Sequence, residues 1–123
     1  MKKSNIRDYA VSAFRYYAIS EKNKSAAVLP ENSRLASGCI LDIIAVEKTL
    51  RELKKTSHGE EILRALKTVY FTMPERDFKK GEISDRVNKA SEDIHAAEAT
   101  IYRFLNRAAI IFAENRGLRI SLF

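Results

Sequence analysis

The sequence is poor in the residues that interrupt helices and in those that form disulfides or metal sites. Among its 123 residues are 2 prolines, 4 glycines and 1 cysteine. So few turn-forming residues argue against a sandwich or barrel of many short strands. Cys39 cannot form an internal disulfide, and with only two histidines beside it the chain cannot complete a Cys/His zinc site. The sequence therefore predicts an all-α protein without a bound metal.

Long apolar runs are also missing. No stretch approaches the roughly 18 apolar residues that a membrane-spanning helix needs. The first five residues, MKKSN, do not lead into the apolar segment of a signal peptide. We therefore expect a cytoplasmic protein with no membrane partner, built as one domain or as one domain plus an arm.

Catalytic motifs are absent as well. The sequence has no glycine-rich phosphate loop, no HExxH motif and no nucleophile elbow. Cys39 lies next to Ile40 on an apolar helix face, where a small buried side chain is more common than a nucleophile. His95 and Glu98 have the spacing of two metal ligands on a helix, but no third or fourth ligand accompanies them. We expect neither an enzyme nor a cofactor.

Basic residues, in contrast, are in excess, and the formal net charge is +6. Residues 1–56 hold 11 Lys and Arg against 6 Asp and Glu, whereas residues 57–123 hold 11 against 10. A basic chain favours an anionic partner such as nucleic acid. A charge of this size is also common in small domains that merely need to stay in solution, so both interpretations remain open.

Apolar residues recur at helical spacing over about residues 4–19, 33–55, 60–72 and 82–115. The polar residues 20–25 and then Pro30 interrupt the first pattern. We therefore predict an N-terminal helical arm and linker at 1–30 and a helical domain at 31–123, in all a bundle of about five helices. The second stretch carries one broad apolar stripe: Leu35, Ala36, Cys39, Ile40, Ile43, Ile44, Val46, Leu50 and Leu53.

The stretch at 82–115 carries two apolar stripes, one on each side of residues 95–97. It fits one continuous helix, or two helices joined by a turn, with Gly117 as the final cap. With a turn, it has the layout of a helix-turn-helix, whose second helix keeps a polar outer face. A plain helical hairpin with a solvated face fits the periodicity equally well. The apolar positions of the two stripes are Ile83, Val87, Ala90, Ile94, Ile101, Leu105, Ala108 and Phe112.

Residues 97–108, AEATIYRFLNRA, followed by FAE at 112–114, resemble the recognition segment of the ArpU/RinA-type phage transcriptional regulators. Those proteins resemble the region-4 domain of bacterial sigma factors, which reads the promoter −35 element. Residues 46–50 with Leu53, and residues 65–71, resemble the helices that precede the helix-turn-helix there. The resemblance covers about residues 40 to 115 and implies a helix-turn-helix at about 82–115.

The resemblance implies sequence-specific control of phage or mobile-element transcription, with double-stranded DNA and RNA polymerase as partners. It also implies which residues face DNA: Thr100, Tyr102, Arg103, Asn106 and Arg107. Arg can donate in a fork to guanine or phosphate, and Asn can pair with adenine through two hydrogen bonds. Lys79 and Lys80 would add phosphate contacts. A homodimer would suit this function, because one short helix-turn-helix reads few bases.

The alternative is a non-enzymatic interaction module that associates with itself or with an RNA polymerase subunit. Its binding surface would be the aromatic N-terminal arm, which carries Tyr9, Phe14, Tyr16 and Tyr17. Against this stands the simpler interpretation that these rings pack on the chain's own core.

Overall fold

The computed structural model describes residues 3–25, 37–72 and 78–118. The described residues form five α-helices and one π-helical turn, with no strand among them. The elements are α1 (Lys3–Ser25), α2 (Ser37–Lys54), α3 (Gly59–Leu66), η1 (Lys67–Phe71), α4 (Glu82–Ile94) and α5 (Glu98–Arg116). The predicted all-α bundle of five helices is confirmed. In the described part of the chain, no helix is long and apolar enough to cross a lipid bilayer.

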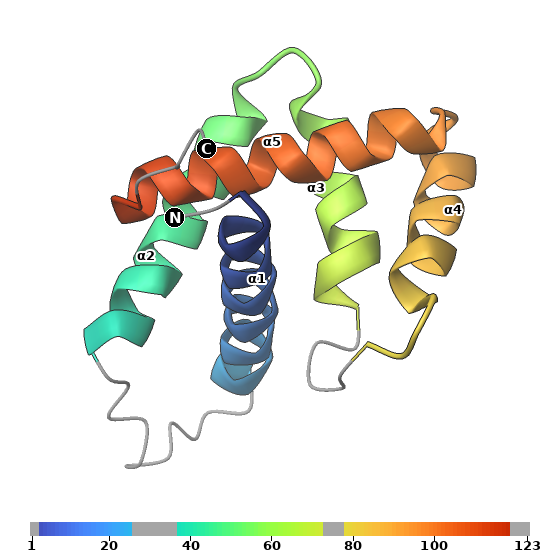
Figure 1. Cartoon of the computed structure of the whole chain (residues 1–123). Helices are drawn as coiled ribbons and strands as arrows, with labels where there is room; N and C mark the ends of the chain where they lie inside the picture. The colour runs from blue at the N-terminus through green and yellow to red at the C-terminus, as the bar shows by residue number, and fades with distance from the viewer. Residues whose placement is uncertain (1–2, 26–36, 73–77, 119–123) are drawn as a thin grey trace.

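Helix α5 holds the bundle together. It runs across the ends of the other helices, with α1 and α2 beside its C-terminal half and α3 and α4 beside its N-terminal half (Figure 1). Its inner face is fully or almost fully buried. The residues of that face are Ile101, Leu105, Ala108, Ala109, Phe112 and Ala113. One helix thus packs against α1, α2, α3 and α4.

Helix α1 lies within the bundle and shares its core. Phe14 is fully buried, and its ring lies 5.7 Å from that of Phe112 and 6.1 Å from that of Tyr70, centroid to centroid. Tyr17 packs against Phe71 at 6.0 Å. Three of the four aromatic side chains named on the N-terminal segment, Tyr9, Phe14 and Tyr17, therefore pack on the chain's own core. The helix also continues to Ser25, beyond the predicted end at about residue 19, and the predicted boundary near residue 30 lies outside the described residues.

Helix α2 corrects the predicted broad stripe. Val46 and Leu53 are fully buried, but Ile40, Leu41 and Ile44 are 47%, 49% and 52% exposed. The stripe is wider than the surface that α1 and α5 cover, so its outer edge faces solvent in the first turns of the helix. The predicted start near residue 33 and the side chains of three stripe residues lie outside the described part of the chain: Leu35, Ala36 and Cys39.

The corner between α2 and α3 depends on a glycine. A Cβ atom on Gly59 would lie 2.1 Å from the carbonyl oxygen of Leu53, far inside van der Waals contact. The absence of a side chain therefore lets α3 begin directly against the last turn of α2. No side chain caps this start, where His58 is the N-cap residue.

Candidate nucleic-acid interface

A three-residue turn separates α4 from α5, which settles the choice between one helix and two. His95 ends α4 in the left-handed conformation, with φ of 60° and ψ of 45°. The backbone N–H groups of His95 and Ala96 both donate to the carbonyl oxygen of Ser91, and the Ser91 hydroxyl donates to the Ala96 carbonyl. Ala97 is extended, and α5 begins with the next residue. These bonds satisfy carbonyl groups that a helix end leaves without partners.

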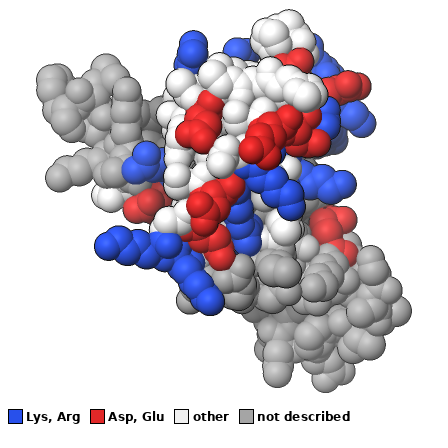
Figure 2. All heavy atoms as spheres, turned by 90° about the vertical axis from the view of Figure 1, so that its right-hand side faces the viewer, with Lys and Arg blue, Asp and Glu red and all other residues white. Residues whose placement is uncertain are grey.

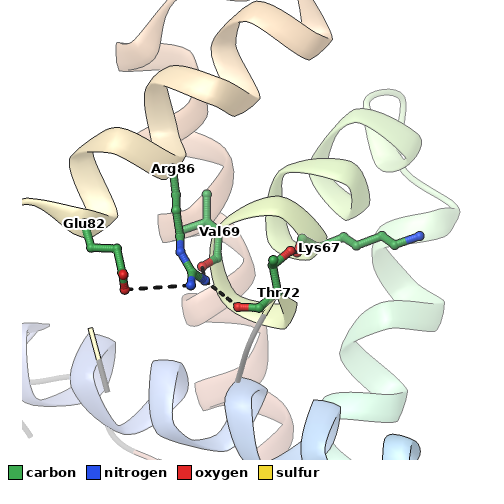
Figure 3. Close-up of polar contacts among 5 residues, drawn as sticks. All are labelled: Lys67, Val69, Thr72, Glu82 and Arg86. Atoms are coloured by element: carbon green, nitrogen blue, oxygen red, sulfur yellow. Dashed lines mark hydrogen bonds and ion pairs between the residues drawn. The ribbon is translucent and has the colours of Figure 1, made fainter. Parts of the chain in front are cut away.

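The start of α4 is attached to the end of η1 through Arg86 (Figure 3). Its Nη1 donates to the carbonyl oxygens of Val69 at 2.8 Å and Thr72 at 2.6 Å. Its Nη2 lies 3.7 Å from the Glu82 carboxylate, and its guanidinium lies 4.7 Å from the centre of the Phe78 ring. The Thr72 hydroxyl donates to the carbonyl of Lys67, which closes the same helix end. Arg86 thereby binds carbonyls that the helical segment leaves unpaired.

A second polar contact joins α3 to α4. Arg64 Nη2 lies 2.8 Å from Asp93 Oδ2, but both side chains are about half exposed, so we expect less than about 1 kcal/mol from this pair. Packing does more, because Val87 and Ala90 of α4 are fully buried. Helices α3, α4 and α5 therefore pack together as a three-helix unit. Contacts along the inner face of α5 hold it in place in this unit.

The outer face of the N-terminal half of α5 carries the residues expected to contact DNA. Tyr102, Arg103, Asn106 and Arg107 are exposed, whereas Thr100 is half-buried. Arg103 and Arg107 lie four residues apart, on the same side of the helix. No hydrogen bond or ion pair within the described residues engages either arginine. This face is consequently open to a partner.

Lys79 and Lys80 lie elsewhere. Both are exposed, and they precede α4, whereas the turn to α5 follows the other end of that helix. The 13 residues of α4 correspond to a length of about 20 Å. Figure 1 shows the start of α4 on the side of the molecule away from α5. The structure therefore does not bring the two lysines together with the arginines of α5.

The side of the molecule formed by α4 is mixed in charge. Figure 2 shows acidic side chains over the middle of this face, with Lys and Arg side chains both between and around them. Helix α4 itself contributes Glu82, Asp85, Glu92 and Asp93 against Arg86 and Lys89. Phosphate groups would be repelled by such acids as much as attracted by the bases. A DNA contact would therefore have to rely on α5 and not on this face.

Tyr102 and Asn106 also line a cavity of about 440 Å³ that reaches α1, η1 and α4. Arg7 and Tyr70 line it too, although no motif in the sequence marks either as a functional residue. No spacing pattern could have found them, because residues 7, 70 and 102 are far apart in the chain and meet only through the packing of α1 against the rest of the bundle.

Comparisons with protein-family models, with curated proteins and with solved structures found no match for this chain. Within the described ranges, no three His, Cys, Asp or Glu side chains are grouped closely enough to hold a metal ion.

Proposed function

We propose that the chain is a sequence-specific DNA-binding transcriptional regulator whose α5 enters the major groove with its N-terminal half. The observation that carries this proposal is the exposed set Tyr102, Arg103, Asn106 and Arg107 at the start of a helix that follows a three-residue turn. Arginine and asparagine are the side chains that most often read guanine and adenine in that groove. The likeness of residues 97–108 to the ArpU/RinA-type regulators supports a role in phage or mobile-element transcription, with RNA polymerase as a further partner.

The arginines of this chain differ in a way that supports the proposal. Arg64 and Arg86 are held by Asp93 and by backbone carbonyls, which fixes them in structural roles. Arg103 and Arg107 have no such partner among the described residues. A guanidinium without an internal partner keeps its donors available for a guanine edge or a phosphate.

Two arginines on a face that also carries Glu98 give a modest electrostatic attraction. Binding as a homodimer to two half-sites would compensate for this, because the contacts of two recognition helices combine on one operator.

The test is a fluorescence-anisotropy titration with random duplex DNA at several salt concentrations, using wild type, Arg103→Ala, Arg107→Ala and Arg51→Ala. Arg51 is exposed on α2 and matches the charge change. We expect micromolar binding that weakens steeply with salt. Each α5 variant should lower the salt slope by about one for a lost phosphate contact, and Arg51→Ala should not. Equal effects of all three substitutions would contradict the assignment of α5, and no binding at low salt would reject the function.

A second candidate, the protein-interaction module, now rests on a different surface. Tyr9, Phe14 and Tyr17 pack within the bundle, but Ile40, Leu41 and Ile44 form an exposed apolar strip on α2. Exposed apolar patches often mark protein contacts. A chain that fails to bind duplex DNA in the titration above would leave this candidate in its place.

A further inference from the structure

The cavity beside α5 has the composition of a small-molecule site. Three aromatic side chains line it: Tyr70, Phe78 and Tyr102. Four polar residues line it as well: Arg7, Asp8, Ser12 and Asn106. Its volume of about 440 Å³ lies within the usual range for ligand pockets, which combine apolar walls with a few polar groups.

One polar group in this cavity lacks a partner. Tyr70 is only 5% exposed, yet no hydrogen bond within the described part of the chain engages its hydroxyl. Arg7, Asp8 and Tyr102 act electrostatically on this hydroxyl, and all three also line the cavity. The hydroxyl end of Tyr70 therefore faces the cavity. The hydroxyl is not fully cut off from solvent, so it can hydrogen-bond to water, and a bound molecule that hydrogen-bonds to it would take the place of that water.

A larger cavity, of about 510 Å³ between α1 and α2, lacks this property. The Tyr9 hydroxyl there donates to Asp42 Oδ1 at 2.7 Å, and Arg116 Nε donates to the same oxygen at 2.7 Å. The Tyr9 hydroxyl and the Asp42 carboxylate in this cavity are therefore already hydrogen-bonded to each other. Size alone would favour the larger cavity, but the unpaired hydroxyl favours the one beside α5.

We propose that the cavity beside α5 binds a small planar aromatic molecule that has no net charge and carries a ring substituent able to hydrogen-bond with Tyr70. The ring of Tyr102, which is 41% exposed, offers a stacked contact to such a molecule, whereas the Phe78 ring already packs against Arg15 and Arg86. Arg7 and Asp8 carry opposite charges, so a net charge on the ligand would gain from one and lose to the other. The proposal concerns the protein without DNA and does not depend on how α5 acts on a nucleic acid.

The first test uses phenol and cyclohexanol, which have the same size and hydroxyl group but differ in aromaticity. Each is titrated into the full chain while NMR follows the methyl groups of Val11, Ile83 and Leu105, which line the cavity. Phenol should shift these methyl signals saturably, with a Kd on the order of millimolar for so small a ligand. Cyclohexanol should bind at least several-fold more weakly. No saturable shift with phenol, or equal binding of the two, would overturn the proposal.

The second test compares phenol with toluene, which lacks the hydroxyl, in wild type and Tyr70→Phe. We expect Tyr70→Phe to weaken phenol binding several-fold and to leave toluene binding unchanged. Benzoate and benzylammonium, which carry opposite charges, should bind wild type more weakly than phenol. Phenol affinity that is the same in both proteins would overturn the role of the Tyr70 hydroxyl.

Discussion

The two halves of α5 use the same kinds of polar residue in different ways. In the C-terminal half, Arg116 Nε donates to Asp42 at 2.7 Å, and Asn115 donates to the hydroxyl of Thr49 at 3.1 Å. In the N-terminal half, Arg103 and Asn106 are exposed. The difference comes from the neighbours, because α2 runs close enough to the end of α5 to supply acceptors. An arginine on a helix thus becomes structural or available according to what packs beside it.

The tyrosines near the two halves differ in the same way. The hydrogen bond from Tyr9 to Asp42, beside the C-terminal half, raises the pKa of Tyr9. Burial raises the pKa of Tyr70, beside the N-terminal half, to about 12. One phenol is stabilised in its neutral form by a partner and the other by exclusion from water. The C-terminal half of α5 is therefore bound into a polar network, and the N-terminal half adjoins unpaired groups.

The largest expected change in stability tests the orientation of α5, on which the comparison of its two halves depends. Leu105 is 4% exposed, so Leu105→Ala should lower the free energy of unfolding by about 2–5 kcal/mol, measured by urea denaturation. Ile110 is 42% exposed on the opposite face, and Ile110→Ala should cost less than about 0.5 kcal/mol. Similar costs for the two variants would mean that the outer face of α5 is wrongly assigned.

The next effect concerns alkaline pH. The pKa of Tyr70 is raised from 10.0 to about 12 on folding, so the unfolded chain loses this proton first as pH rises. The associated stability is complete below pH 10 and is lost as pH rises towards 12, by up to about 2.7 kcal/mol for a shift of about two units. Urea denaturation of wild type and Tyr70→Phe at pH 9 to 12 measures it. The wild type should lose more stability than the variant, and parallel pH profiles would show that Tyr70 is not buried in its neutral form.

A smaller effect sharpens the contrast between the arginines. Arg116→Met removes a donor from a mostly buried pair with Asp42 and should cost about 1–2 kcal/mol. Arg103→Met makes the same chemical change on the exposed half and should stay within about 0.5 kcal/mol. Thermal or urea unfolding of the two variants decides this. If Arg103→Met costs as much as Arg116→Met, the N-terminal half is held by contacts like those of the C-terminal half.

The spacing of apolar residues correctly predicted the buried faces of α4 and α5. Their apolar stripes are narrow, so only one orientation of each helix buries the whole stripe. The prediction from spacing was wrong on α2, where a broad stripe left open which edge would be covered, and Ile40 and Ile44 remain exposed. Gly117 was recognised as a cap because glycine favours the left-handed conformation that it adopts, at φ of 80°. His95 adopts the same conformation without such a signal, so the sequence left the turn undecided.

The candidate site, too, could be predicted from the sequence only in part. That Arg103 and Arg107 share the outer face of α5 follows from their spacing. The position of Lys79 and Lys80 depends on how α4 crosses α5, which the sequence did not determine. The cavity at Tyr70 depends on the docking of α1, more than forty residues away in the chain. The spacing of residues therefore predicts which of them share a face of a helix. Which distant segments come into contact is known only from the three-dimensional structure.

The glycine at the corner of α2 and α3 has a consequence for tracing this fold in other chains. Apolar positions can exchange Leu, Ile and Val as long as the core volume is kept, so they lose their identity as sequences diverge. The position of Gly59 has no such freedom, because any side chain would meet the backbone of Leu53. A divergent chain with the same corner should retain glycine about six residues after the last buried leucine of its second helix. That glycine would allow the two sequences to be aligned even where their apolar residues no longer match.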